Sequence, residues 1–542
     1  MTTTTVTPTA KRNVLLVFAG LMVAMLLASL DQTIFSTALP TIVGQLDGVS
    51  HMLWVTTAYI LASTIVMPVY GKLGDLIGRK SLFIIAIALF IAGSVVGGLA
   101  DSMTALIVGR AIQGLGGGGL MILAQAIIAD VVPARERGKY SGIMGAVFAV
   151  SSVAGPLLGG FFTDGPGWRW AFWMNIPLGA IAIASAVFFL TLPKGTTRNP
   201  RIDYAGMTVL ALAATCLVLF TTWGGNTYDW NSPVIIGLIA ATVVAAVAFV
   251  LIERRAAEPV IPMHLFKNRN FNLTTAAGLI TGVAMFGALA YMPTYLQMVT
   301  GVGATQAGFL MIPMMGALLL SSIVSGQIVS KTGRYKAIPI IGTVLVAVGL
   351  TLLSTLLATT AVWIICVYLA IMGLGLGMSM QILILVVQNS FPVSQVGTAT
   401  ASNNFFRQIG SSLGSAIVGS LFVSRLTASL AENLPAGAAG GSGTNSLTPA
   451  VVNALPQGIR DIIVGAYNES LAPIFLYLVP LVLIAAVLLA FVQEKPLATT
   501  IDRGETDAVD STGPEAASDT TPVRVPVLAT TSVTASTAAS PA

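Results

Sequence analysis

The sequence predicts an all-α protein that crosses a membrane many times. Of its 542 residues, 55% are hydrophobic and only 9% are charged, whereas about 25% of the residues in soluble domains are charged. Apolar runs of about 20 residues, the length that a helix needs to cross a bilayer, occur fourteen times. The alternating pattern of membrane-spanning strands is absent. The class is therefore a polytopic helical membrane protein, and a soluble globular protein and a barrel are both excluded.

The fourteen predicted helices fall into two groups of six with a pair between them. They begin near residues 13, 51, 81, 104, 138, 170, 204, 232, 271, 303, 335, 361, 398 and 470. We expect a first bundle over 13–193, two additional helices over 204–253 and a second bundle over 271–493 that contains an external loop at 425–469. Within that loop, 456–470 has the pattern of an amphipathic segment on the membrane surface.

The two termini are predicted to lie in the cytoplasm. With the N-terminal segment 1–12 inside, the cytoplasmic segments collect 21 of the 26 Lys and Arg residues, as the positive-inside rule requires for an even helix count. The first span follows two basic residues as a signal peptide does, but its length and Asp31 predict an uncleaved helix. The tail, 494–542, is rich in Thr, Ser, Ala and Pro and is expected to be disordered.

Several classes of function find no support in the residues. Cys216 and Cys366 lie mid-span, and His51 and His264 are far apart, so neither a disulfide framework nor a metal site is expected. The glycine run at 116–119 lacks the Lys-Ser/Thr that follows a phosphate-binding loop. We therefore expect neither an enzyme nor a bound cofactor. A nucleic-acid partner is not expected either, because the excess of basic residues reflects the topology of the membrane spans.

The most informative motif joins the second and third predicted helices. The residues Gly71-Lys-Leu-Gly-Asp-Leu-Ile-Gly-Arg-Lys80 crowd four charges into a short turn that must be covered by neighbouring helices. The segment resembles the signature of the major facilitator superfamily, Gly-x-x-x-Asp-x-x-Gly-Arg-Arg/Lys. The match includes Gly71, Asp75, Gly78, Arg79 and Lys80. A weak repeat 255 residues later, at Gly326, Gly333 and Arg334, indicates two homologous halves.

Asp31 is the only acidic residue that falls deep within a predicted span. An ionised carboxylate facing lipid is costly, so we expect it to face a central cavity and to be protonated in one conformation and ionised in another. The alternative is a carboxylate tied permanently to Arg110 or to neighbouring Gln and Ser side chains. The surrounding Leu30-Asp-Gln-Thr-Ile-Phe-Ser-Thr-Ala-Leu-Pro40 resembles the first-helix motif of drug:proton antiporters, with Phe35 in place of a smaller aliphatic residue.

Two further motifs resemble this antiporter branch. Gly109-Arg-Ala-Ile-Gln-Gly114 is similar to its Arg-x-x-Gln-Gly motif, so Arg110 is expected to tune the proton site or, alternatively, to hold two helices together. Ala154-Gly-Pro-Leu-Leu-Gly-Gly160 is similar to the fifth-helix motif of antiporters, which importers of the superfamily generally lack. The resemblance implies that the small residues around the proline seal a gate.

Gate and substrate positions follow from these motifs and from polar or adaptable residues near the predicted cavity. Trp168-Arg-Trp-Ala-Phe-Trp-Met-Asn175 resembles the start of the sixth helix in the fourteen-helix branch. The expected gate residues are Gly71, Asp75, Gly78, Arg79, Lys80, Glu136, Gly155, Pro156, Gly159 and Gly160. The expected substrate contacts are Trp54, Tyr59, Gln113, Met121, Gln125, Asn175, Tyr291, Gln297, Met314, Gln381, Asn403 and Arg407.

The resemblance implies a proton-coupled exporter of amphipathic, drug-like compounds in the plasma membrane. It would be a monomer surrounded by lipid and powered by a proton gradient. A dedicated exporter of an endogenous lipid or metabolite is the alternative, and a proton symporter for uptake is less favoured by the fifth-helix motif.

Overall fold

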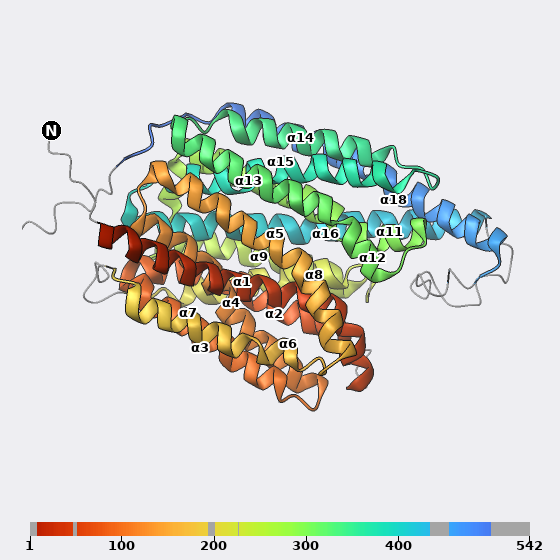
Figure 1. The fold of residues 1–542 in the computed structure, drawn as a ribbon, viewed down its shortest axis with the longest axis horizontal. Coiled ribbons are helices and arrows are strands. Elements are labelled where there is room, and N and C mark those ends of the chain that lie inside the picture. Colours follow the sequence, from red (N-terminus) through yellow and green to blue (C-terminus); the bar gives the residue numbers. More distant parts are fainter. Residues whose placement is uncertain are drawn as a thin grey trace, which may run out of the picture. The chain divides into compact units, whose positions relative to one another are not determined.

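The computed structural model describes residues 8–46, 51–192, 201–225, 227–433, 452 and 455–499. Residues up to Ile501 form one compact unit, drawn in Figure 1. In the described residues, fourteen helices are long and apolar enough to cross a membrane. The predicted class and helix count are confirmed. Of the predicted tail only 494–499 is described, and most of the predicted 1–12 segment lies outside the described residues.

The first six spans form the N-terminal bundle. They are α1 (Pro8–Gln45), α2 (Met52–Ile77), α3 (Arg79–Gly98), α4 (Met103–Val131), α5 (Ala134–Asp164) and a broken sixth span of α6 (Trp170–Trp173) and α7 (Asn175–Phe189). The turn predicted at 71–80 is shorter than expected, because α2 continues to Ile77 and α3 starts at Arg79. Gly78 alone reverses the chain with φ of 98°, a conformation that favours glycine.

The next two spans are α8 (Tyr204–Trp223) and α9 (Pro233–Glu253). Asp203 caps α8 by accepting the N–H of Gly206 at 2.8 Å, and Ser232 caps α9 in front of a proline at the first helical position. α8 contacts both α2 and α16. Apolar side chains fill this junction, including Leu210 and Phe249 from the pair and Phe405 from α16.

The last six spans form the C-terminal bundle. Its elements are η2 (Met263–Lys267), α10 (Arg269–Leu289), α11 (Met292–Thr300), α12 (Ala304–Leu310), α13 (Ile312–Thr332), α14 (Ala337–Ser354), α15 (Val362–Gln388), η3 (Val393–Gln395), α16 (Val396–Asn433) and α18 (Gln457–Ala490).

The external loop predicted at 425–469 is narrower in the structure. Residues 425–433 end α16, and 457–469 form the first turns of α18 rather than a separate surface segment. These helix ends are held by apolar contacts, since Phe422 packs edge-on against Tyr467 with ring centroids 4.7 Å apart. The remaining residues of that loop lie outside the described residues, apart from 452, 455 and 456.

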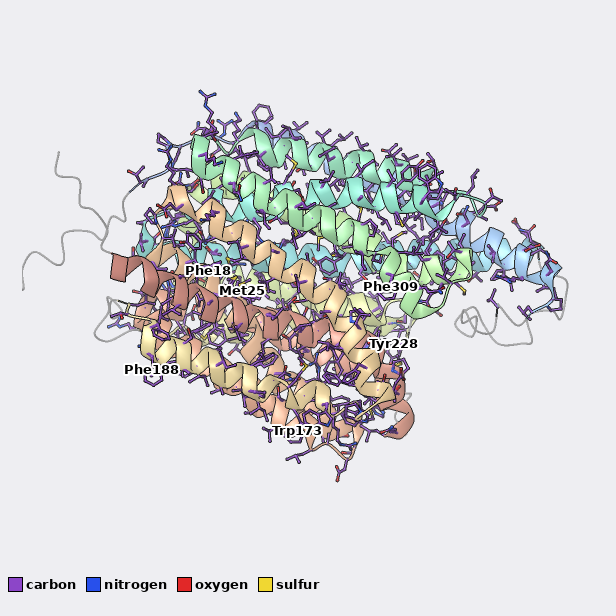
Figure 2. The ribbon with its side chains drawn as sticks, in the orientation of Figure 1. Phe18, Met25, Trp173, Phe188, Tyr228 and Phe309 are labelled. Carbon is purple, nitrogen blue, oxygen red and sulfur yellow. The ribbon has the colours of Figure 1, made fainter. Side chains whose placement is uncertain are left out.

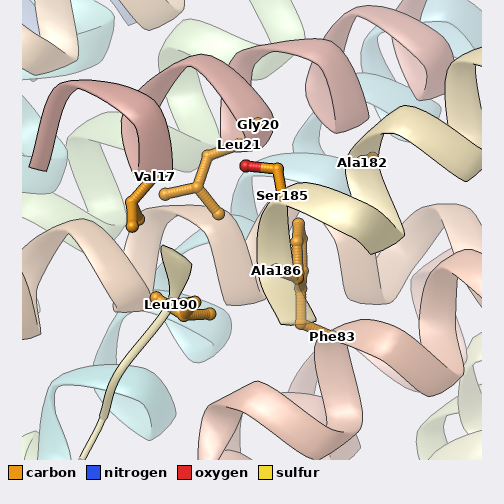
Figure 3. Close-up of a pocket in the computed structure, with 8 residues that line it drawn as sticks. All are labelled: Val17, Gly20, Leu21, Phe83, Ala182, Ser185, Ala186 and Leu190. Atoms are coloured by element: carbon orange, nitrogen blue, oxygen red, sulfur yellow. The ribbon is translucent and has the colours of Figure 1, made fainter. Parts of the chain in front are cut away.

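The outer surface of the helices is apolar, as contact with lipid requires. Phe188 on α7 is 77% exposed, and Figure 2 shows it on the outside of the helices. Inside the N-terminal bundle, small residues bring helices into close contact. Figure 3 shows one such place, where Ser185 of α7 lies against Gly20 of α1 and a side chain at position 20 would collide with it.

The two bundles meet closely near the end of the helices that carries Gly78, called the Gly78 end below. A side chain at Gly71 of α2 would lie 2.8 Å from the carbonyl oxygen of Gly397 in α16. A side chain at Gly138 of α5 would lie 2.9 Å from the carbonyl oxygen of Gly326 in α13. Arg135 also donates hydrogen bonds to the carbonyls of Ser330 and Lys331 across the same junction. In this conformation the bundles are in contact at the Gly78 end.

Candidate functional site

Asp31 lies in the middle of the N-terminal bundle with no solvent exposure. Its Oδ2 accepts a hydrogen bond from Arg110 of α4 in a buried ion pair. Its Oδ1 accepts from Gln113 Nε2 at 3.0 Å and from Asn175 Nδ2 at 3.2 Å. The sequence-predicted residues Asp31, Arg110, Gln113 and Asn175 are thus brought together from α1, α4 and α7.

A residue that the sequence reasoning missed completes this group. Ser94 of α3 accepts hydrogen bonds from Gln113 at 2.7 Å and from Asn175 at 3.1 Å. Its only signal in the sequence is that it is a hydroxyl residue within an apolar span. Asp31, Ser94, Arg110, Gln113 and Asn175 are called the Asp31 cluster below.

Aromatic rings hold the guanidinium of Arg110 from two sides. Its Cζ lies 4.2 Å from the ring centre of Phe35 and 4.4 Å from that of Tyr59. Phe35, the residue that departs from the antiporter motif, therefore contributes a cation–π contact. Tyr59, expected to touch substrate, instead covers the ion pair in this conformation.

The cluster is arranged so that the charge on Asp31 decides which contacts are favourable. The ionised carboxylate is fully supplied with donors, which offsets the cost of removing it from water. A proton on Asp31 would cancel its attraction to Arg110 and leave that cation without an acidic partner in the cluster. In this conformation Asp31 is ionically paired with Arg110.

A second charged group lies at the Gly78 end, between α2 and the start of α16. Arg79 pairs with Asp75 at 2.6 Å and also with Asp130 of α4. Asp75 accepts from the backbone N–H of Gly397 at 3.1 Å and from the N–H and hydroxyl of Thr398, both at 2.7 Å. A carboxylate at a helix N-terminus is favoured by the unpaired N–H groups and by the helix dipole.

This α2–α16 junction differs in part from the sequence-based expectation. Asp130, at the end of α4, is the second partner of Arg79, whereas Glu136, one of the residues expected at the gate, is exposed in the first turn of α5. Arg79 also donates to the carbonyl of Val393 at 3.0 Å, so it reaches the C-terminal bundle as well. Lys80 donates to the carbonyl of Val187 at 3.0 Å and ties α3 to α7.

A third polar group lies between the bundles. Asn404 of α16 donates to Gln125 Oε1 of α4 at 3.0 Å and accepts from Arg407 at 2.5 Å. Gln388 of α15 donates to the backbone carbonyl of Gln125 at 3.3 Å. The structure thus connects the predicted residues Gln125 and Arg407 through Asn404, which the sequence reasoning did not select.

The comparisons with known proteins agree with this architecture. Residues 21–415 match the model of the Major Facilitator Superfamily. The chain belongs to the major facilitator superfamily. It is 40% identical over 490 residues to an uncharacterised MFS-type transporter of Mycobacterium tuberculosis (strain ATCC 25618 / H37Rv), covering 90% of this chain and 70% of the relative.

Other relatives of the superfamily are named for their transport activity. The multidrug transporter protein MdtP of Bacillus subtilis (strain 168) is 37% identical over 456 residues, 83% of each chain. A solved structure of the proton:xylose symporter XylE, in complex with a sugar analogue, aligns with a TM-score of 0.57 at 16% identity, covering 90% of this chain and 98% of the other. This chain is therefore a membrane transporter of the superfamily with multidrug transporters among its relatives, and the symporter likeness shows the fold alone.

Within this superfamily fold, the other predicted substrate residues do not form one cluster. Trp54 packs edge-on against Trp223 of α8, and Met314 is buried in the core of the C-terminal bundle. Tyr291 donates to the Ser415 carbonyl at 3.2 Å, and Asn403 donates to Thr275 at 3.1 Å. The rest are half-buried: Met121, Gln297 and Gln381.

The glycines of the α5 motif have different surroundings. Gly155 and Gly159 lie against α1, and a side chain at position 159 would be 2.7 Å from the carbonyl oxygen of Ile34. Pro156 accepts a long hydrogen bond of 3.5 Å from Thr37 through its carbonyl. Gly160 faces open space. The motif therefore brings α5 close to the helix that carries Asp31, which its sequence pattern alone did not indicate.

Proposed function

We propose that this transporter is a proton-coupled exporter of amphipathic, drug-like compounds in the plasma membrane. The observation that carries the proposal is the buried Asp31 of α1, an ionisable group inside the N-terminal bundle whose hydrogen-bond partners come from α4 and α7. A buried acid that exchanges its proton between conformations is what a proton-driven cycle needs, because coupling requires unequal proton affinity in the two states.

The proposed cycle begins with protonation of Asp31. The proton neutralises the carboxylate and removes its attraction to Arg110, so the contacts that join α1 to α4 weaken. Gln113 and the rings of Phe35 and Tyr59 remain to support the guanidinium. Helix α1 then shifts relative to α4, and because α5 packs on α1 through Gly155 and Gly159, the shift is passed to α5. Loss of the proton on the other side restores the pair.

The α2–α16 junction acts as the gate in this cycle. The contacts that join the two bundles here are hydrogen bonds, including those from Gly397 and Thr398 to Asp75, and they can break and form again as a unit. The ion pairs of Arg79 with Asp75 and Asp130 hold that carboxylate in place from within the N-terminal bundle. We propose that this end faces the cytoplasm, with both termini, as the distribution of 21 of 26 basic residues favours. The conformation seen here would then be closed toward the cytoplasm. Each proton that crosses into the cytoplasm releases about 2.3 kcal/mol of free energy per 100 mV of membrane potential, which can drive export.

The proposed substrate passes between the bundles, where Gln125, Asn404 and Arg407 lie. Arg407 is half-buried within the span of α16, and it donates a hydrogen bond to the neutral Asn404. An intramembrane cation of this kind usually faces a cavity or a pathway. The relative MdtP is named as a multidrug transporter. We propose the same class of drug-like substrates for this chain.

The test is efflux of a fluorescent lipophilic cation such as ethidium from cells that express the transporter. We expect efflux that stops on addition of a proton uncoupler and is lost in Asp31→Asn. The matched control is Asp101→Asn, because Asp101 is an exposed acid that precedes α4. Uncoupler-sensitive efflux that is unchanged in Asp31→Asn would show that another group carries the proton.

Direction and substrate range are tested with the same variants. Accumulation of the dye in cells, where depletion is expected, would favour uptake by symport. A panel of toxic compounds in deletion and overexpression strains separates multidrug export from a dedicated exporter of an endogenous lipid or metabolite, since only the former protects against unrelated compounds.

A further inference from the structure

Two carboxyl groups that each have a buried oxygen lie in the additional helix pair, away from the Asp31 cluster. Asp203 begins α8, and Glu253, only 3% exposed, ends α9. One oxygen of each has a donor, since Asp203 Oδ1 accepts the Gly206 N–H at 2.8 Å and Glu253 Oε1 accepts the Val260 N–H at 3.1 Å. The other oxygens, Asp203 Oδ2 and Glu253 Oε2, are buried without a hydrogen-bond partner among the described residues.

The two carboxyl groups face the same glycine. A side chain at Gly206 would collide with Asp203 Oδ2 and would lie 2.9 Å from Glu253 Oε1. Position 206 therefore needs a glycine. Because glycine has no side chain, the end of α9 can approach the start of α8 here. The two acids therefore lie close together, with Glu253 buried and Asp203 half-buried.

The nearby cation is engaged elsewhere. Lys72 of α2 forms an ion pair of 2.6 Å with Glu258, five residues after Glu253. Arg254 and Arg255, which follow α9, are exposed. Lys72, Glu258, Asp203 and Glu253 together bring one positive and three negative charges to this site when all are ionised. Two adjacent carboxylates, each with a buried oxygen that has no donor among the described residues, are unfavourable in that state.

We propose that Asp203 and Glu253 hold one proton between them and form a second protonation site, located in the α8–α9 pair. A shared proton supplies the missing donor to a buried oxygen and removes one of the two negative charges. A sodium ion fits less well, since hard cations take about six or more oxygen ligands and the site offers two free oxygens among the described residues.

The position of this pair links it to the gate. Glu253 holds the segment that follows α9 through the N–H of Val260, and Glu258 of that segment holds Lys72, three residues before Asp75. A cavity of about 360 Å³ lined by Lys72, Asp75, Glu258 and His264 lies beside the Lys72–Glu258 ion pair and reaches the Asp75 carboxylate of the junction. Ionisation of the pair would thus alter the segment that braces α2 next to the α2–α16 junction.

The test is infrared difference spectroscopy of the purified full chain in detergent, without substrate or gradient. At neutral pH we expect a protonated-carboxyl C=O band equivalent to one proton per chain. Glu253→Gln should lose this band. Asp203→Asn, which keeps the helix cap, should also lose this band. Glu253 then has no charged carboxylate beside it and should be ionised at neutral pH. The controls are Glu432→Gln, an exposed acid of α16, and Asp31→Asn, both of which should retain the band.

Two outcomes would overturn the proposal. One is a spectrum in which folded Glu253→Gln and folded Asp203→Asn match the unchanged protein. The other is a band that disappears when sodium replaces a large organic cation at constant pH, which would indicate a cation site. Because the readout needs no transport, failure of this proposal is distinguishable from failure of proton-coupled export.

Discussion

Asp75 of α2 accepts two hydrogen bonds from Thr398 of α16, one from its backbone N–H and one from its hydroxyl, each 2.7 Å long. The two residues are 323 positions apart and belong to different bundles. The same carboxylate pairs with Arg79, which in turn reaches Asp130. One acid therefore links the turn between α2 and α3 to the first turn of the helix that carries Arg407.

Removal of the Thr398 hydroxyl should open the Gly78 end more often. A hydrogen bond to a charged group contributes about 1.5–3 kcal/mol, so Thr398→Val should shift the ratio of open to closed molecules by about ten-fold or more. Spin labels at Glu136→Cys and Arg334→Cys, in a background without Cys216 and Cys366, would report longer distances between the bundles. Thr427→Val is the control, because that hydroxyl is exposed and donates to the carbonyl of Val423 in its own helix.

Removal of Arg110 should destabilise the protein more than removal of both charges. In Arg110→Gln the Asp31 carboxylate stays buried without its cation, a situation that typically costs about 3–5 kcal/mol. Chemical unfolding of the purified protein should show this loss, and Asp31→Asn combined with Arg110→Gln should recover most of it. Equal stability of the single and double variants would mean that the pair is not coupled. Arg334→Gln, an exposed arginine, serves as the control.

The adjacent glycines of α5 should respond differently to the same substitution. Gly159→Ala places a carbon against the carbonyl oxygen of Ile34, and because backbone atoms cannot move aside easily, a loss of about 1–3 kcal/mol is expected. Gly160→Ala meets nothing within 4 Å and should leave unfolding and efflux unchanged. A loss of stability at both positions would point to a general requirement for glycine in this segment.

Tyr335, in the turn between α13 and α14, should make stability fall at alkaline pH. Burial raises the pKa of its hydroxyl, which also accepts the N–H of Lys495 at 2.7 Å. The folded chain keeps this proton when an unfolded tyrosine has lost it, so the contribution is complete below about pH 10 and declines as the pH rises further. Tyr335→Phe should lower stability by about 1 kcal/mol at neutral pH and reduce the alkaline decline. Tyr204→Phe, an exposed tyrosine, should change neither.

The helices and most members of the Asp31 cluster could be predicted because their signals are local. An apolar run of about 20 residues records the thickness of a bilayer, and a lone acid within such a run stands out because its burial is costly. Asp31 stands out from its own surroundings, and Arg110, Gln113 and Asn175 are indicated by short motifs that resemble those of the antiporter branch. The same reasoning could not find Ser94, since a single serine in an apolar helix is common and gains meaning only from its neighbours in space.

Partner choice, in contrast, depended on tertiary packing. Asp130 resembles any acid at a helix end, yet the crossing of α2, α3 and α4 places it on Arg79, whereas Glu136 remains exposed. Likewise, Gly155, Gly159 and Gly160 are the same residue type in one short motif. Only the position of α1 determines that Gly155 and Gly159 lie in a helix contact and that Gly160 does not.

The sequence by itself determined the membrane class, the fourteen spans and the position of a buried acid, because hydropathy and the cost of charge act along the chain. Only the tertiary structure decided which cation and amides surround Asp31, which acid completes the α2–α16 junction, and that Asp203 and Glu253 lie beside the same residue, Gly206. These relationships join residues between about 50 and more than 300 positions apart, and they arise from the way that helices cross, which no local pattern encodes.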